Sequence, residues 1–270
     1  MKTILITGVS SGLGRAVADA ALTCGHRVVG TLRNEAARKA FETLAPGRAF
    51  GRLLDVTDTT AIAPLVAAVE AEQGPVDVLV NNAGYGHMGV LEEVALDDLR
   101  RQFEVNVFAP VALIQAVLPG MRARGRGHIV NMSSMGATVT FPGLGAYHGS
   151  KFALQGLGDA LAQEVAPFNI RVTSVQPGVY RSDWGGRSLS TSERRIAGYD
   201  WVFDPARTAG LVWGDPAALG RVVAEVIDAE DPPLHLLVGP TALGMVRATL
   251  AAQSAEIDRW ELLSMADGEG

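Results

Sequence analysis

Short apolar runs alternate along the chain with longer amphipathic stretches rich in Ala and Leu. The short runs are apolar on both sides, as expected of parallel strands that helices cover on two faces. Strands are predicted at residues 2–7, 27–32, 50–54, 77–80, 128–132, 170–176 and 234–238. Helices are predicted at residues 12–24, 34–45, 58–73, 97–123, 147–165, 216–229 and 241–262. The alternation predicts an α/β fold: a doubly wound, seven-stranded, mostly parallel sheet with helices on both faces.

One segment, residues 179–215, departs from this rhythm, because Gly, Ser, Arg and aromatic residues replace a short crossover. Its aromatic residues are Trp184, Tyr199, Trp201, Phe203 and Trp213. Loops of this length in compact domains are often functional, so we expect an apolar substrate lid. The alternative is that the rings anchor the loop or cover a subunit contact. No linker or repeat divides the chain, so residues 1–270 are expected to form one domain.

Charge and cysteine content narrow the classes of partner and compartment. The 270 residues carry 23 Lys and Arg against 29 Asp and Glu, a net charge of −6, which argues against a nucleic-acid partner. The single cysteine, Cys24, excludes an internal disulfide and a Cys-based metal site, and we expect it to be packed as a small apolar residue. The first apolar run is too short for a signal peptide, and residues 105–121 fall short of a membrane span. A cytoplasmic protein without a membrane-spanning helix is expected.

Glycines recur with the spacing G-x-x-x-G-x-G between the first predicted strand and the first predicted helix. Such a turn lets the backbone approach a pyrophosphate, which the free N–H groups and the helix dipole stabilise. Elsewhere in a chain, a glycine triplet is as often a structural turn, but this position predicts a dinucleotide site. The residues expected to contact the dinucleotide here are Gly8, Ser10, Ser11, Gly12, Leu13 and Gly14.

Further motifs follow in order along the chain. They are Asn81-Asn82-Ala83-Gly84, Asn106, Asn131-Met132-Ser133-Ser134, the pair Tyr147 and Lys151, and Gln176-Pro177-Gly178. With Thr7-Gly8 and the glycine turn, this set resembles the short-chain dehydrogenase/reductase family from residue 7 to about residue 183. Residues 177–184 and the long lid are also loosely similar to a bacterial branch related to hydroxysteroid and retinol dehydrogenases. The resemblance implies a Rossmann fold and hydride transfer between a nicotinamide and a carbonyl or alcohol carbon.

Tyr147 and Lys151 lie one helical turn apart, so their side chains share a face. An ammonium beside the phenol is expected to lower the Tyr147 pKa and to make it a general acid or base. Alone, such a pair is usually a surface coincidence.

Ser134 ends a predicted strand, where its hydroxyl can donate to a substrate oxygen. Ser133 is the competing candidate, but a serine turn fits Ser133 better and the family spacing selects Ser134.

The resemblance assigns roles to several other residues. It implies that Asn106 holds a water in a proton relay to Lys151, although the residue alone suggests a helix kink. It places Asn82, Ala83 and Gly84 alongside the cofactor. It implies contacts of Asp55 and Val56 with adenine, and of Pro177, Gly178, Val179 and Ser182 near the nicotinamide carboxamide.

The residue at the end of the second strand distinguishes the two nicotinamide cofactors. An acidic residue there accepts from the ribose hydroxyls of NAD, whereas a cation suits the phosphate of NADP. Leu32 holds the usual acidic position and Arg33 follows, which favours NADP over NAD. Glu35 is the counter-argument, but it follows Asn34, a predicted N-cap, and is expected to serve the helix dipole.

The substrate pocket is expected to be neutral and mainly apolar, suited to a ketone, aldehyde or secondary alcohol. Its predicted residues are Tyr85, Met135, Phe141, His148 and Trp184. The histidines show no paired ligand spacing, so no metal is expected. The resemblance implies a homodimer or homotetramer through the helix of Tyr147 and the helix before it. An NAD-linked dehydrogenase or a non-catalytic cofactor sensor on the same fold are the alternative functions.

Overall fold

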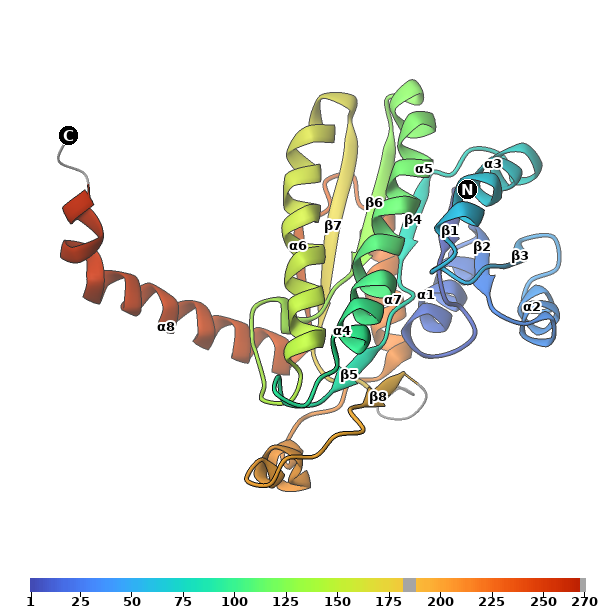
Figure 1. Ribbon diagram of the computed structural model, residues 1–270. Coiled ribbons are helices and arrows are strands. Elements are labelled where there is room, and N and C mark those ends of the chain that lie inside the picture. Colours follow the sequence, from blue (N-terminus) through green and yellow to red (C-terminus); the bar gives the residue numbers. More distant parts are fainter. Residues whose placement is uncertain (182–187, 268–270) are drawn as a thin grey trace.

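The computed structural model describes residues 1–181 and 188–267. Seven parallel strands form one sheet in the order β3-β2-β1-β4-β6-β7-β9 (Figure 1). The strands are β1 (Thr3–Ile6), β2 (Arg27–Leu32), β3 (Ala49–Leu53), β4 (Val78–Asn81), β6 (Gly127–Met132), β7 (Ile170–Pro177) and β9 (His235–Val238). The order reverses between β1 and β4, and in open α/β sheets ligands bind at such a switch point, beyond the carboxyl ends of the strands.

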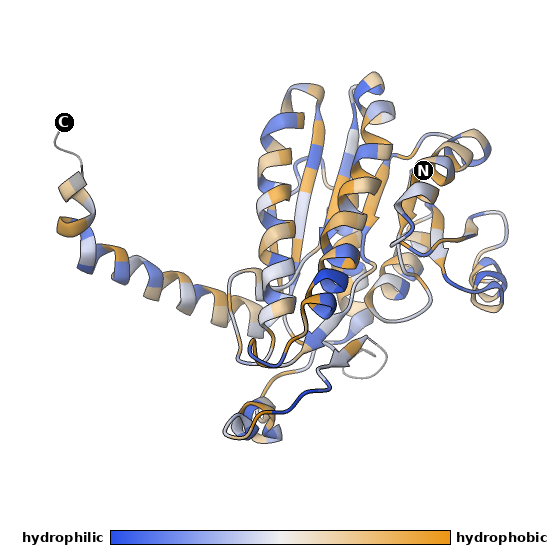
Figure 2. Cartoon of the chain, in the orientation of Figure 1, coloured by the Kyte–Doolittle hydropathy of each residue, from blue (hydrophilic) through white to orange (hydrophobic). Residues whose placement is uncertain are grey.

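Two layers of helices cover the sheet. The helices are α1 (Gly12–Thr23), α2 (Glu35–Glu42), α3 (Thr59–Gln73), α4 (Leu96–Phe103), α5 (Ala109–Arg124), α6 (Gly145–Val165), α7 (Pro216–Asp228) and α8 (Pro240–Ser264). Buried side chains of α1, α2 and α7 pack on one face, and those of α3, α5 and α6 pack on the other. Successive residues of β1 alternate between these two cores, so Ile4 and Ile6 join the first and Leu5 joins the second. In Figure 2 the strands of the sheet are coloured mainly as hydrophobic, and the helices beside them mix hydrophobic and hydrophilic residues. The predicted fold class is confirmed.

The helix predicted at residues 97–123 contains a change of helical type. A π-helical turn, Glu104–Phe108, separates α4 from α5 and contains Asn106, in agreement with the alternative interpretation of that residue as a kink. The whole stretch Leu96–Arg124 is continuous over 29 residues, and by length and composition it could cross a membrane. Residues 105–121 alone are shorter than a membrane span, but the helix that contains them is not. Its buried residues Leu113, Val117 and Met121 pack on the sheet, as in core helices that pass the same test.

A second, two-stranded parallel sheet has no counterpart among the predicted elements. It pairs β5 (Gly86–Met88) with β8 (Leu189–Thr191), which belongs to the long segment after β7. Three-residue strands give no clear periodicity, because their pairing depends on partners about a hundred residues away. Cys24 is exposed at the end of α1, so the expectation that it packs in the core is also wrong.

Candidate active site

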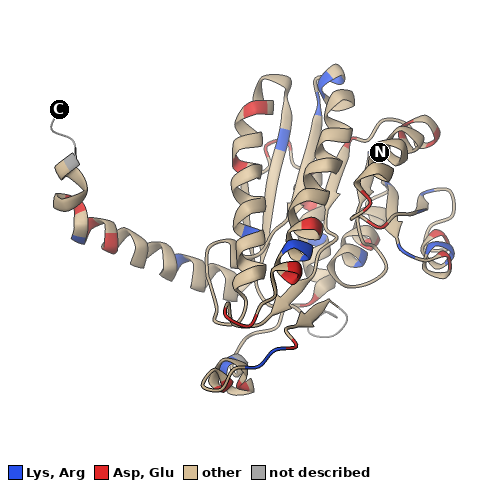
Figure 3. Cartoon of the chain, in the orientation of Figure 1, with Lys and Arg blue, Asp and Glu red and all other residues tan. Residues whose placement is uncertain are grey.

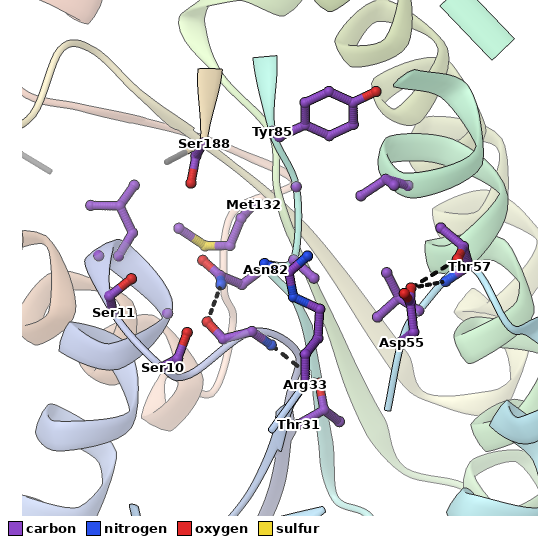
Figure 4. Close-up of a pocket in the computed structure, with 18 of the residues that line it drawn as sticks. Ser10, Ser11, Thr31, Arg33, Asp55, Thr57, Asn82, Tyr85, Met132 and Ser188 are labelled. Carbon is purple, nitrogen blue, oxygen red and sulfur yellow. Dashed lines mark hydrogen bonds between the residues drawn. The ribbon is translucent and has the colours of Figure 1, made fainter. Parts of the chain in front are cut away.

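A cavity of about 470 Å³ opens at the carboxyl ends of the central strands, beside the switch point. Its size falls within the usual range of small-molecule and cofactor sites. The predicted site residues that line it are Gly8, Ser10, Ser11, Gly12, Leu13, Gly14, Arg33, Asp55, Val56, Asn82, Ala83, Gly84, Tyr85, Tyr147 and Lys151. Segments that are distant in sequence thus meet as predicted around one cavity (Figure 4).

The glycine turn is held in place by Asn82. The Asn82 Nδ2 donates to the backbone oxygens of Thr7 (2.8 Å) and Gly8 (3.1 Å). A Cβ added at Gly14 would lie 2.1 Å from Asn82 Nδ2, so only glycine fits this contact. Gly12 has a φ of +63°, and a Cβ there would meet nothing within 4 Å. The first turn of α1 therefore faces open space in the cavity, as an anion site at a helix N-terminus requires.

Two further contacts fasten the turn to the sheet. The Thr7 hydroxyl accepts from the N–H groups of Asn82 (3.0 Å) and Ala83 (2.9 Å). Asn81 donates to the side chain of Asn131 (2.9 Å), its register partner on β6. The asparagines of the two strand-end motifs thus join the central strands, and Asn82 holds the glycine turn through hydrogen bonds to its backbone.

Charged side chains gather at the cavity end formed by β2 and β3. Arg33 and Arg101 both line the cavity, and both lower the pKa of Asp55, although hydrogen bonds from Thr57 are the larger cause. Asp55 accepts from the Thr57 backbone (3.0 Å) and hydroxyl (2.8 Å) (Figure 4). Within the described residues, neither arginine joins an ion pair or a hydrogen bond, so both guanidinium groups are available to an anion. Arg101 could not be assigned from sequence, because no local pattern shows that this exposed-looking arginine of α4 faces the ends of β2 and β3.

Glu35, the counter-argument to NADP, does not line the cavity. Its carboxylate pairs with Arg38 at 2.6 Å, and Arg38 also pairs with Glu42 at 2.7 Å. Asn34 caps α2 by accepting from the Ala37 N–H (2.8 Å), which confirms the predicted N-cap. The carboxylate of Glu35 is thus occupied within its own helix.

Tyr147 and Lys151 lie together on α6, with the Lys151 Nζ 5.8 Å from the centre of the Tyr147 ring. The ammonium is buried and donates to the Met132 carbonyl (2.7 Å). Burial lowers the pKa of Lys151 to about 8. It also raises the pKa of Tyr147, although a hydrogen bond with Ser134 acts in the opposite direction. The expectation that the Tyr147 pKa is lowered is therefore wrong for the protein on its own, since desolvation dominates.

Of the two serines after β6, Ser134 both makes the turn expected of Ser133 and contacts Tyr147. Ser134, not Ser133, makes the serine turn by accepting from the Gly136 N–H (2.9 Å). This bond occupies one acceptor site and leaves the hydroxyl proton to donate, and Ser134 is the serine bonded to Tyr147. Ser133 lines the cavity, and its buried hydroxyl has no hydrogen-bond partner among the described residues.

Asn106 links two walls of the site. Its Oδ1 accepts from the Tyr85 N–H (3.1 Å), and its Nδ2 donates to the Tyr85 carbonyl and to the Ser150 hydroxyl (3.0 Å each). Ser150 in turn donates to the Tyr147 carbonyl (2.7 Å). The Asn106 amide thus ties the loop after β4 to the helix that carries Tyr147. A water relay to Lys151 stays a prediction.

Of the predicted substrate residues, Tyr85 lines the cavity, whereas Met135, Phe141 and His148 do not. Met135 and Phe141 pack beside α8, and both ring nitrogens of His148 are used, one with the Gly136 carbonyl and one with the Phe141 N–H (2.9 Å each). His148 is therefore structural. Ser182 and Trp184 lie outside the described residues.

Three predicted cofactor residues lie at the end of β7 without lining the cavity. They are Pro177, Gly178 and Val179. Gly178 donates to the Val238 carbonyl (3.1 Å), Val179 accepts from the Gly214 N–H (2.9 Å), and a Cβ on Gly178 would lie 3.1 Å from the backbone of Ala242. The two hydrogen bonds fasten the end of β7 to β9 and to the segment before α7, and the nicotinamide contact stays a prediction.

The described part of the long segment covers the cavity through β8 rather than through its aromatic residues. Ser188, Leu189 and Ser190 line the cavity, whereas Tyr199, Trp201, Phe203 and Trp213 do not. Tyr199 donates to Glu92 (3.0 Å) and Arg195 stacks 4.4 Å from the Phe203 ring, whereas Trp201 and Trp213 are 53% and 47% exposed. A role of these rings as a substrate lid stays a prediction.

His87 fastens β8 over the cavity. This side chain is buried on β5, and its two ring nitrogens lie 2.9 Å from the hydroxyls of Ser190 and Ser192. No local pattern signals this role, because the serines follow His87 by more than a hundred residues.

The residues around the cavity fit a phosphorylated dinucleotide. The open first turn of α1 can hold a pyrophosphate, Asp55 and Val56 line the space beyond β3, and Tyr147 and Lys151 lie at the other end. No group of three or more His, Cys, Asp or Glu that could hold a metal occurs among the residues described.

Comparison with known proteins extends this result. The sequence model described as short chain dehydrogenase matches residues 2–192. The oxidoreductase BOA17 of Botryotinia fuckeliana is 37% identical over 270 residues, 98% of each chain. An NADPH-dependent 3-dehydrocapnine reductase of Ornithobacterium rhinotracheale is 34% identical over 90% of each chain. Human retinol dehydrogenase 8 is 37% identical over 87% of this chain and 80% of its own. A crystal structure of a short-chain dehydrogenase from Streptomyces avermitilis is 41% identical, covers 98% of both chains and has a TM-score of 0.92.

Proposed function

This chain belongs to the short-chain dehydrogenase family, and from that premise we propose that it is an NADP(H)-dependent oxidoreductase of apolar ketones, aldehydes or secondary alcohols. The observation that carries the proposal is the hydrogen-bonded pair Ser134 and Tyr147 beside the buried ammonium of Lys151. Tyr147 and Lys151 line the cavity from α6, and Ser134, which does not itself line it, follows the carboxyl end of β6.

The chemistry follows from the protonation states of these groups. When bound, the nicotinamide cofactor supplies or accepts the hydride. The Tyr147 phenol keeps its proton at neutral pH, because burial raises its pKa, so it can donate that proton to a carbonyl oxygen during reduction. Ser134 can donate to the same oxygen as negative charge develops. The Lys151 ammonium stabilises the phenolate that remains, and in oxidation Tyr147 takes the proton back.

Three observations support NADP as the preferred cofactor. Arg33 follows the last residue of β2 and has no partner within the described residues, and Arg101 lines the same end of the cavity. Glu35, the acidic residue that could favour NAD, is paired with Arg38. One relative is named as NADPH-dependent. A guanidinium suits the phosphate that distinguishes NADP, because it can donate two parallel hydrogen bonds.

An apolar substrate is supported by the lining of the cavity near Tyr147. The lining includes the uncharged residues Tyr85, Val105, Met132 and Leu189, and Met132 ends β6 beside the turn of Ser134. The arginines of the lining are assigned to the cofactor, since Arg33 and Arg101 both lie close enough to Asp55 to lower its pKa. We therefore expect a neutral carbonyl or alcohol with a largely hydrocarbon body.

The test combines turnover with binding. Purified protein is incubated with NADPH or NADH and a panel of apolar ketones and aldehydes, and Tyr147→Phe is compared with Tyr199→Phe, a matched control outside the cavity. We expect Tyr147→Phe to bind NADP⁺ but to lose at least 100-fold in kcat, and Tyr199→Phe to keep both. Equal turnover by Tyr147→Phe would remove it from the mechanism. Tight binding of NADP⁺ by the wild type, without turnover of any substrate, would favour the non-catalytic sensor.

A further inference from the structure

The C-terminal helix α8 leaves the body of the protein after its first turns and projects away from the sheet (Figure 1). Its buried residues are Ala242 and Val246, both near its start. Every described side chain from Leu250 to Ala266 is exposed. A free helix of about 15 residues is marginally stable in water, so this length of ordered helix requires a partner.

Apolar residues on the projecting part follow a heptad pattern. We define the seam as Leu243, Val246, Leu250, Gln253, Ile257 and Trp260, whose spacings alternate between three and four residues. This is the a/d pattern of helices that pack on another helix. We call the part of the seam from Leu250 to Trp260 the outer seam. Its apolar residues Leu250, Ile257 and Trp260 are 52%, 69% and 53% exposed, so it has nothing packed on it within the described chain.

Exposed apolar side chains continue to the tip of the helix. Leu263, which flanks the seam, is 67% exposed, whereas Leu262 and Met265, which are 91% and 68% exposed, lie off the seam. Leu250, Ile257, Trp260 and Leu263 present roughly 450 Å² per copy, about half of the ~800 Å² that each partner buries in a standard interface, so two arms would form a small interface. The match with the Streptomyces avermitilis crystal structure covers 98% of this chain, so it extends into the projecting part of α8.

The charges on α8 favour another protein helix over a membrane surface. Arg247 lies near the base, whereas Glu256, Asp258 and Glu261 surround Arg259 toward the tip (Figure 3). A helix that lies on a membrane needs a polar face rich in Lys and Arg, and this acidic excess repels anionic lipid. Parallel packing of two copies would bring the acidic tips together, whereas antiparallel packing brings the tip of one toward Arg247 of the other.

We propose that α8 is a dimerisation arm, which packs antiparallel on α8 of a second copy of this chain through the seam. With Leu250 opposite Trp260 of the second copy, Gln253 lies opposite Ile257 and the outer seam is covered on both arms. The same register places Glu261 within about one turn of Arg247 of the second copy. This proposal does not depend on the proposed function or on any contact between the α5 and α6 helices.

The first test measures molecular mass by sedimentation velocity on the full chain. The double variant Leu250→Glu/Ile257→Glu introduces two charges into the seam, and Ala248→Glu/Ala255→Glu introduces two charges with the same spacing on the opposite, exposed face of α8. We expect the seam variant to have half the mass of the wild type at micromolar concentration, and the control variant to keep the wild-type mass. An unchanged mass for the seam variant, or an equal loss in the control, would overturn the proposal. Circular dichroism and thermal melting check that both variants fold.

A second test examines the antiparallel orientation by cross-linking. In a Cys24→Ser background, Leu250→Cys protein and Trp260→Cys protein are treated with a short bismaleimide, alone and mixed. We expect covalent dimers mainly in the mixture. Cross-linking of each variant alone, but not of the mixture, would show parallel packing and refute the orientation. Seam-dependent flotation of the wild type with phosphatidylserine vesicles, without a change of mass between the variants, would refute the dimerisation arm itself.

Discussion

We expect the buried ammonium of Lys151 to make the protein less stable than a neutral side chain of the same shape would, and the pH dependence of unfolding tests this. Burial lowers the Lys151 pKa to about 8 from its usual 10.5. A pKa difference of about 2.5 corresponds to a cost of about 3 kcal/mol for the charged form. Between pH 8 and 10.5 the unfolded chain binds the proton and the folded chain does not. This group therefore makes the free energy of unfolding rise with pH through that window.

Lys151→Met removes the charge and keeps an unbranched chain of similar length. We compare the free energy of unfolding of the variant minus that of the wild type at two pH values. We expect this difference to be about 2 kcal/mol larger at pH 7.0 than at pH 9.5. The constant effects of the substitution, such as the lost bond to the Met132 carbonyl, cancel in this comparison. Tyr147 does not contribute within this range, because its pKa is raised above 10.

The assay is urea unfolding of both proteins at several pH values, at one protein concentration because self-association shifts apparent stability. Lys39→Met on α2 is the matched control, since its exposed side chain carries no burial cost, and its difference from wild type should not change with pH. A pH-independent difference for Lys151→Met would show that the buried ammonium carries no such cost. Turnover by Lys151→Met should fall at least 100-fold, which separates its catalytic from its structural effect.

Three further predictions test the rest of the site. Arg33→Ala should lower the ratio of kcat/KM with NADPH to kcat/KM with NADH at least 10-fold, because it removes a cation from the cavity, and an unaltered ratio would contradict the cofactor assignment. Arg52 pairs with Glu72 outside the cavity, so Arg52→Ala should leave this ratio unchanged. Ser190→Ala/Ser192→Ala should raise the Kd for NADP⁺ several-fold with little change in melting temperature, because β8 loses its bonds to His87, and a wild-type Kd measured by calorimetry would argue against that role. Asn106→Ala should lower kcat more than it raises KM, since it unties Tyr85 from the helix of Tyr147, and a change in KM alone would count against a positioning role.

Much of the fold follows from local pattern. The strand predicted at residues 27–32 is where β2 lies, and the other strands of the large sheet are within one or two residues of their predictions. Strand runs that are apolar on both sides and amphipathic helices are properties of consecutive residues, so a single sequence carries them. The glycine turn and the Tyr147–Lys151 pair can also be found from sequence, because their chemistry depends on short spacing.

Features of the site that depend on residues far apart in the chain follow from the three-dimensional packing. Arg101 reaches the cavity from α4, β8 pairs with β5 through His87, and Met135 and His148 turn away from the cavity. The folded structure also sets how far each side chain is removed from water. Burial raises the pKa of Tyr147, whereas its neighbour Lys151 alone would lower it. Local sequence pattern thus specified the elements, the order of the motifs and the class of chemistry. Which side chains face the cavity, which are desolvated and where α8 points were set by long-range packing, since each depends on neighbours that only the folded chain brings together.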